Sequence, residues 1–205
     1  AWTQSVSPAR WLAAKLAVPA ALLTAGTLLL VLLHRLAWGA HTELFHGMGT
    51  RQWYNDGNYF ANGTLAPAYA LLGLTVGVLT GLLVQRSLAA SGSTFLAFLV
   101  LQFVIMSLRP HLWPVETLTS KDGYPEYIGL VVGDGALAST GKPITDPVCV
   151  ADTRCLADHD VVGFYRDHHP VSHFWPLQLM ETGIVLALAA AATGAAFRLL
   201  RRRTV

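Results

Sequence analysis

Charged residues are scarce in this sequence. Aspartate, glutamate, lysine and arginine make up 13% of its 205 residues, about half the fraction usual in soluble domains. Hydrophobic residues account for 53%, and the mean hydropathy is +0.46. This composition argues against a soluble protein with a large core. It is typical of an integral membrane protein.

The apolar residues are gathered into four runs, each close to the length that a helix needs to cross a bilayer. They predict spans at 12–33, 65–84, 88–108 and 177–200. The first run is too long for the apolar part of a cleaved signal peptide, and three more spans follow it. The predicted fold class is therefore an all-α membrane protein with four transmembrane helices.

Acidic residues are missing from three short basic segments. Residues 1–15, 85–93 and 198–205 hold seven Lys or Arg and no Asp or Glu. Because positive loops stay on the cytoplasmic side, both termini are predicted to be cytoplasmic. Three segments follow from this topology. Residues 1–108 hold a cytoplasmic coupling segment and the first three spans, with an outer loop at 34–64. Residues 109–175 form an extracytoplasmic cap. Residues 176–205 hold the last span and a basic cytoplasmic tail.

The cap is too polar to enter the membrane and is predicted to be a small α+β insert. Runs of β-favouring residues predict strands at 127–132 and 144–150, with a turn at 133–135. Residues 161–165 fit either another strand or a turn of helix.

Cysteine is nearly absent from the sequence, and its two copies, Cys149 and Cys155, both lie in the cap. A disulfide forms and persists outside the cytoplasm, so we predict that these two are bonded. A ring this small adds a few kcal/mol of stability at most, because the entropic gain grows with loop length.

No nucleotide-binding motif is present. The run from Gly135 to Pro143 superficially resembles a phosphate-binding loop, but Ala136 stands where its first glycine belongs. Pro143 also replaces the Ser or Thr that would hold Mg²⁺. The chain is therefore not expected to hydrolyse nucleotide, and no nucleophile–base pair for another hydrolysis stands out. No cofactor is predicted for it.

Small residues recur at every fourth position of the second predicted span, at Gly73, Gly77 and Gly81. They leave a groove where another helix can approach closely. Packing within the chain and a seam between two copies both fit this pattern.

Gln102 and Glu181 lie inside predicted spans, and both are candidates for a translocation path. Gln102 carries an amide that needs partners in hydrocarbon, so it should face other helices. Glu181 is an ionisable group about a turn and a half after Trp175-Pro176, and such a group is a functional hypothesis by default. A boundary position bonded to Arg109 or to a loop amide is the other interpretation.

Metal-capable side chains are concentrated in the cap. They are His159, His168, His169 and His173, with Asp158, Asp160 and Asp167 beside them. Their spacing fits no standard zinc site, and solvated surface clusters of this kind are common. A membrane-anchored metal-binding enzyme or sensor remains an alternative function.

A family resemblance begins at the first residues. The stretch from Trp2 to Lys15, WTQSVSPARWLAAK, resembles the sequence before the third membrane helix of ABC-type-two export permeases, especially actinobacterial ones. The stretch FWPLQLMETG at 174–183 resembles the entry to their last helix. Such permeases usually carry two further helices upstream, and the printed sequence begins after them.

The resemblance implies a function. It identifies the chain as a permease subunit in a bacterial plasma membrane, exporting a hydrophobic or amphipathic compound by alternating access. A separate ATP-binding subunit would drive transport through a cytoplasmic contact at Trp2, Arg10, Trp11 and Lys15. A second permease subunit, expected to be another copy, would complete the path, since four spans make a poor conduit. Membrane lipid is expected around it and nucleic acid is not, and an accessory role in a larger membrane complex stays open.

Overall fold

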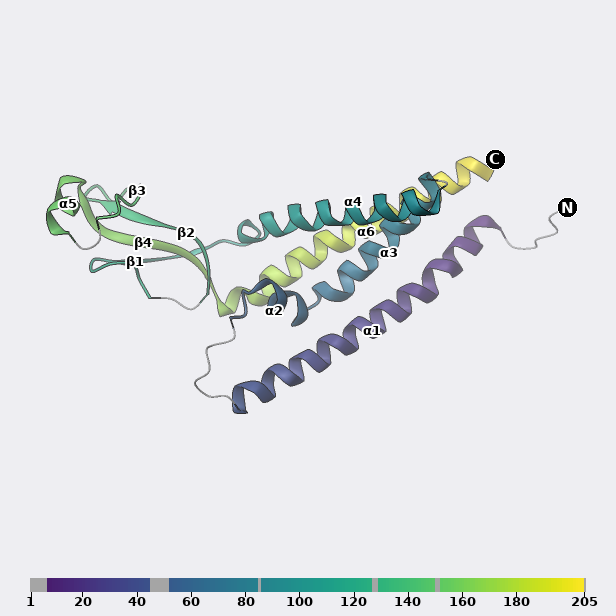
Figure 1. Ribbon diagram of the computed structural model, residues 1–205, viewed down its shortest axis with the longest axis horizontal. Coiled ribbons are helices and arrows are strands. Elements are labelled where there is room, and N and C mark those ends of the chain that lie inside the picture. The colour runs from purple at the N-terminus through teal and green to yellow at the C-terminus, as the bar shows by residue number, and fades with distance from the viewer. Residues whose placement is uncertain (1–6, 45–51, 85, 127–128, 150–151, 205) are drawn as a thin grey trace. The chain divides into compact units, whose positions relative to one another are not determined.

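The computed structural model describes residues 7–44, 52–84, 86–126, 129–149 and 152–204. The chain forms two compact units (Figure 1). The helical unit comprises Ala1–Thr50, Asp56–Arg109 and Gln178–Val205. The strand unit comprises Arg51–Asn55 and Pro110–Leu177.

Among the described residues, four helices are long and apolar enough to cross a membrane, as the sequence predicts. These helices are α1 (Pro8–Leu44), α3 (Leu65–Leu83), α4 (Ser87–Leu108) and α6 (Phe174–Thr204). A short helix, α2 (Asp56–Ala61), precedes α3 and was not predicted.

The first helix begins at Pro8, four residues before the predicted span, and continues beyond the predicted end of that span at Leu33. Ser7 caps it, since its carbonyl accepts from the Trp11 N–H at 3.0 Å and its hydroxyl from the Arg10 N–H at 3.4 Å. The predicted outer loop at 34–64 is wrong at its start, because α1 continues to Leu44. The prediction placed the end of the helix where hydropathy falls. A helix instead continues for as long as its backbone N–H···O=C hydrogen bonds continue. Residues 34–44 contain no proline to stop it.

The third helix lies at the centre of the helical packing. It contacts both α1 and α4, and it buries Leu65, Ala68, Tyr69, Leu72 and Val76. In α4, by contrast, Ile105 is the one buried residue among those described, and Phe103 is 75% exposed. Apolar side chains on the outside of a spanning helix contact lipid favourably, whereas the same exposure to water would be unfavourable.

The strand unit contains an antiparallel sheet in the order β1-β4-β2-β3. Its strands are β1 (Glu116–Ser120), β2 (Gly129–Ala138), β3 (Pro143–Ile144) and β4 (Val161–Pro170). The described residues also form one further helix, α5 (Thr153–Asp158), and two 3₁₀ turns, η1 (Arg109–His111) and η2 (Val171–His173). Residues 161–165 therefore belong to a strand, and β1 is a strand that the sequence analysis missed.

The predicted turn at 133–135 is wrong. These residues continue β2, and Gly133 and Gly135 pair with Asp167 and Tyr165 of β4. The reversal comes later, where the Gly141 N–H donates to the Ala138 carbonyl at 2.8 Å. Gly141 has a φ of +76°, a conformation that glycine adopts without steric cost.

The predicted strand at 144–150 is also wrong over residues 145–149, because β3 ends at Ile144. Val150 lies outside the described residues. Asp146 starts a local turn instead, with its Oδ1 accepting from the Val148 N–H at 2.8 Å. Pro147 has no N–H to donate to a neighbouring strand, and Val148 has a φ of 59°. The hydrogen bond from the Val148 N–H to the Asp146 side chain thus replaces one that the backbone could have made in a sheet.

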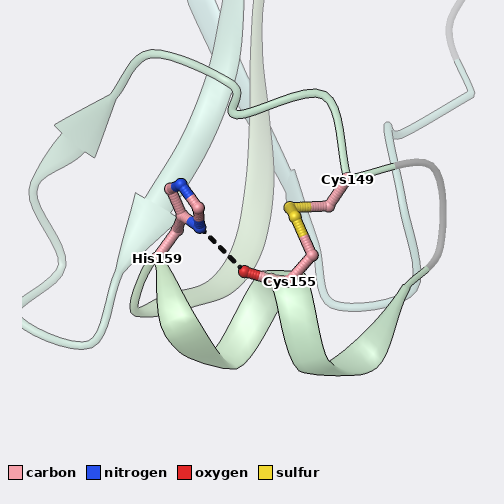
Figure 2. Close-up of side chains that lie close together, drawn as sticks. All are labelled: Cys149, Cys155 and His159. Carbon is pink, nitrogen blue, oxygen red and sulfur yellow. Dashed lines mark hydrogen bonds between the residues drawn. A yellow bond between two sulfur atoms is a disulfide. The ribbon is translucent and has the colours of Figure 1, made fainter.

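The predicted disulfide is confirmed. Cys149 and Cys155 are joined with their Cα atoms 5.5 Å apart (Figure 2). Asp152 lies between them and caps α5, its side chain accepting from the Arg154 N–H at 2.9 Å. The bond therefore fastens the start of α5 to the segment that follows β3.

Candidate functional site

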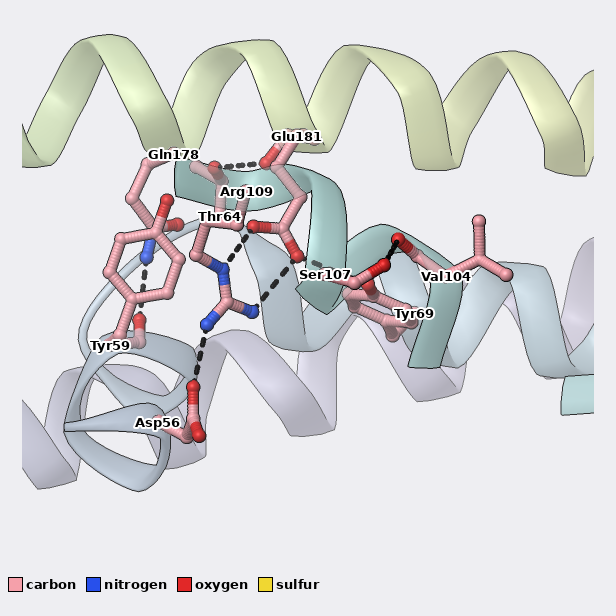
Figure 3. Close-up of polar contacts among 10 residues, drawn as sticks. Asp56, Tyr59, Thr64, Tyr69, Val104, Ser107, Arg109, Gln178 and Glu181 are labelled. Atoms are coloured by element: carbon pink, nitrogen blue, oxygen red, sulfur yellow. Dashed lines mark hydrogen bonds and ion pairs between the residues drawn. The ribbon is translucent and has the colours of Figure 1, made fainter. Parts of the chain in front are cut away.

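The candidate site is a network of charged and aromatic side chains inside the helical unit (Figure 3). Glu181 comes from α6, where Leu177, Gln178, Glu181 and Val185 recur at helical spacing and are all 0% exposed. That face of α6 is buried, so its one carboxylate is buried with it. Arg109 follows the last residue of α4 and is 7% exposed.

Arg109 and Glu181 form a two-point ion pair. The Arg109 Nε lies 2.7 Å from Glu181 Oε2, and Nη2 lies 3.2 Å from Oε1. The Tyr69 hydroxyl of α3 donates to the same Oε1 at 3.1 Å. Parallel N–H···O bonds of this kind fix the relative orientation of guanidinium and carboxylate. Of the partners predicted for Glu181, Arg109 is the one present.

The guanidinium has two further contacts from α2. Its Nη1 lies 2.8 Å from Asp56 Oδ1, and its Cζ is 4.4 Å from the centre of the Tyr59 ring. Arg109 therefore connects three parts of the helical unit: α2, the end of α4 and, through Glu181, α6. Its one positive charge faces two carboxylates, but the Asp56 side chain is 67% exposed and remains solvated.

Burial of the Arg109–Glu181 pair costs desolvation free energy. A charge removed from water pays a large desolvation cost, which only a well-placed partner and further hydrogen bonds offset. Glu181 has both, because Arg109 and Tyr69 occupy its two oxygens. Burial, and then the nearby Glu181 carboxylate, raise the pKa of Tyr59, so that its phenol remains neutral.

An amide and a glycine support the network. Gln178 Nε2 donates to the Tyr59 carbonyl, while its Oε1 has no hydrogen-bond partner among the described residues. A Cβ at Gly63 would lie 2.2 Å from that Oε1, so no larger residue fits there without displacing Gln178. The hydroxyls of Thr64 and Thr182 lie 2.7 Å apart and add a bond between the start of α3 and α6.

The proposed coupling residues lie apart from this network, in the first turns of α1. Arg10, Trp11 and Lys15 are exposed, whereas Leu12 and Leu16 on the same helix are buried. The basic and aromatic side chains therefore share the open face of the helix. Trp2 lies outside the described residues.

The glycines of α3 face α4 in part. A Cβ at Gly73 would meet Phe98 at 3.7 Å, and one at Gly77 would meet the Thr94 methyl at 3.7 Å. Gly81 has open space around it. Gln102 of α4 is half-buried and makes no side-chain hydrogen bond to another described residue, so it does not join the charged network.

The histidines predicted as alternative metal ligands divide between two places. His168, His169 and His173 lie on β4 and η2, where His169 Nε2 is 2.9 Å from the Pro110 carbonyl and Nδ1 is 3.0 Å from His173 Nδ1. His173 Nε2 faces Glu116 Oε1 at 3.3 Å. Burial lowers the pKa of His169, outweighing its hydrogen bond to that carbonyl.

His159 lies at the end of α5 beside the disulfide (Figure 2). Together with Cys149 and Cys155 it forms a group of three metal-capable side chains within the described residues. The two sulfurs are bonded to each other and so offer no thiolate. His159 Nδ1 is 3.0 Å from the Cys155 carbonyl.

Sequence reasoning missed four members of the network: Asp56, Tyr59, Tyr69 and Gln178. The signal for Gln178 was its position three residues before Glu181, which places both on one face of a helix. Tyr69 lies in an apolar span, where a hydroxyl needs a partner. Asp56 and Tyr59 carry no comparable signal, because α2 is a short helix inside an aromatic loop.

Comparison with known proteins gives one result. No curated protein and no solved structure matches the chain. The family model described as "ABC-2 membrane transporter related" matches residues 1–109, which is more than half of the 205 residues and includes α1, α3 and α4. The part of the chain that the structure describes has four membrane-length helices, so this is a multi-pass membrane protein, and it belongs to the ABC-2 membrane transporter related family.

Proposed function

We propose that the chain is the membrane-spanning permease subunit of an ABC exporter. The family match across residues 1–109 is the observation that carries this proposal. ATP is hydrolysed in a separate ATP-binding subunit, and this chain is a transport subunit rather than an enzyme. It needs no cofactor of its own, because the energy arrives through movement of the partner.

The proposed orientation places both termini in the cytoplasm of a bacterial cell and the strand unit outside its plasma membrane. The basic segments at 1–15, 85–93 and 198–205 support this orientation. The Cys149–Cys155 disulfide supports it independently, since such bonds persist in oxidising compartments.

The first turns of α1 receive the movement of the ATPase. Arg10, Trp11 and Lys15 are exposed there, and the preceding Trp2 would extend the same contact. Because α1 is one continuous helix of 37 residues, displacement of its first turns is transmitted along the span. Two copies of the chain enclose the path, and they alternate between inward-open and outward-open states.

The Arg109–Glu181 network acts as a fixed point during this movement. It joins α2, the end of α4 and α6 through directed bonds at the end of the unit away from the first turns of α1. Helices held together at one end can separate at the other. Glu181 and Gln102 remain candidates for contact with a hydrophobic or amphipathic substrate along the path.

A charge-reversal experiment tests the coupling surface. Arg10→Glu with Lys15→Glu should reduce co-purification with the ATP-binding subunit and lower transport, because charge complementarity governs docking at exposed surfaces. Arg86→Glu with Arg202→Glu is the matched control, since both residues are exposed basic side chains outside α1.

Equal ATPase recovery from both double variants would reject α1 as the coupling surface. Purification of the intact chain from its native membrane without any ATP-binding subunit would reject the exporter proposal itself. A stable complex with other membrane proteins would then favour the accessory role.

A further inference from the structure

A separate polar cavity of about 440 Å³ lies within the strand unit. Its lining includes Tyr124, Asp134, Ile144, Thr145, Asp146 and Tyr165. These residues come from β2, β4, the end of β3 and the segment after it, and the connection between β1 and β2. The cavity takes no part in the proposed coupling or in the Arg109–Glu181 network.

The wall beside β2 is closely fitted. A Cβ at Gly135 would lie 2.9 Å from the Tyr165 ring and 2.8 Å from the Ile144 carbonyl oxygen. Only glycine therefore allows the Tyr165 ring and the β3 backbone to approach β2 this closely. This explains why Gly135 lies inside a strand, where glycine usually weakens pairing.

The carboxylate of Asp146 is held in place. Its Oδ2 accepts from the Tyr124 hydroxyl at 2.6 Å, and its Oδ1 accepts from the Val148 N–H at 2.8 Å. No lysine, arginine or histidine forms an ion pair with Asp146 in the part of the chain that the structure describes. Its negative charge therefore has no cationic partner there.

The second carboxylate is partly neutralised. Arg166 Nη2 lies 3.3 Å from Asp134 Oδ2, and the guanidinium carbon is 4.9 Å from the centre of the Tyr124 ring. Arg166 also donates to the Pro125 carbonyl at 2.9 Å. With one carboxylate paired and the other not, the side chains around the cavity retain a net negative charge.

The carboxylates of Asp134 and Asp146 supply hydrogen-bond acceptors in this lining. The Tyr124 hydroxyl is committed to Asp146, and burial with that hydrogen bond raises the pKa of Tyr124 to about 12. It stays protonated and does not add a second negative charge. An anionic ligand would be repelled, whereas a cation that donates hydrogen bonds matches both the charge and the carboxylate acceptors.

We propose that this cavity binds a small organic ammonium cation, with Asp146 facing its charge and the ring of Tyr165 beside it. Aromatic rings attract ammonium groups through their negative faces, and a carboxylate adds a charge-assisted contact. The site gives the strand unit a ligand of its own, independent of the compound that is exported.

The test uses the full chain in detergent micelles and two probes, choline and ethanolamine, followed by ligand-observed NMR and calorimetry. The neutral control is the carbon isostere of choline, in which a quaternary carbon replaces the nitrogen. At least one ammonium probe should bind, and the isostere should bind about tenfold more weakly or not at all, as cation–π and carboxylate contacts predict.

Asp146→Asn should weaken binding by about tenfold, because it removes the charge and keeps an oxygen for the Val148 N–H. Asp122→Asn is the matched control, since Asp122 is exposed in the β1–β2 connection. Tyr165→Leu is a second variant that leaves the Asp146 turn intact and should also weaken binding. Wild-type protein that binds neither probe, equal binding of choline and its isostere, or equal loss in the Asp146 and Asp122 variants would each overturn the proposal.

Discussion

The two units contain the same polar chemistry in different surroundings. In the helical unit, Arg109 lies over Tyr59 and pairs with Glu181. In the strand unit, Arg166 lies over Tyr124 and pairs with Asp134. The first pair is buried, with side chains 9% and 0% exposed, and the second is more open, at 17% and 44%.

Burial decides what each pair contributes. A buried pair adds little net stability beyond that of an apolar replacement, yet loss of one partner is severe because the other charge stays desolvated. An exposed pair is worth roughly 0–1 kcal/mol, because solvent screens it and replaces a lost partner. The buried Arg109–Glu181 network therefore fixes how the helices pack. The more exposed Arg166–Asp134 pair lies beside a cavity in which we propose that a ligand binds.

Removal of Arg109 should have the largest effect. Arg109→Ala leaves Glu181 buried without its ion-pair partner and should destabilise the chain by about 3–5 kcal/mol, measured by unfolding in detergent micelles. Arg109→Met combined with Glu181→Leu should recover most of that loss, because no buried charge then remains. A double variant as unstable as Arg109→Ala would show that the network stabilises the unit through more than charge compensation.

Neutralisation of Glu181 should cost less. Glu181→Gln keeps the shape and one acceptor, so we expect a loss of about 1.5–3 kcal/mol, typical of hydrogen bonds to charged groups. If the network guides export, transport should fall while membrane expression and ATPase association stay near normal. Full transport by this variant would reduce Glu181 to a structural role.

Loss of the disulfide should affect the strand unit alone. Cys149→Ser with Cys155→Ser should lower stability by at most about 2 kcal/mol, since the closed loop is short. Hydrogen exchange should speed up around α5 and remain unchanged in α3. Faster exchange in both units would mean that the bond constrains more than this local segment.

The exposed ion pair should give a small effect. Asp134→Asn should change the stability of the strand unit by less than about 1 kcal/mol, in contrast to the buried pair. Hydrogen exchange of β2 and β4 amides provides the measurement. A loss comparable with that of Arg109→Ala would contradict the dependence on burial that separates the two networks.

The pH dependence of the strand unit should be smaller still. Because the pKa of His169 is lowered by burial, the unfolded chain binds a proton more readily than the folded one. Stability is then full above the unfolded pKa of about 6.5 and falls as the pH drops below it. Protection factors of β4 amides, which correct each exchange rate for its intrinsic dependence on pH, should fall from pH 7.5 to pH 5.5 in the wild type, and less so in His169→Gln.

The helices could be predicted because hydropathy and length alone identify a span. The strands could not be placed as well, because the patterns were local and ambiguous. Gly133, Asp134 and Gly135 read as a turn, but Gly135 serves close packing against Tyr165. The β1 strand, Glu116–Ser120, has polar residues at most positions and gains its structure from pairing with β4.

The sequence by itself determined four membrane helices and a disulfide between its two cysteines. It also indicated that Glu181 needs a partner, because a charge in a span is too costly alone. Only the tertiary structure decided that Arg109 is that partner, 72 residues earlier in the chain, and that Tyr69 and Asp56 join it. Hydrophobicity acts residue by residue and can be read along the chain, whereas the pairing of buried polar groups depends on which helix faces meet.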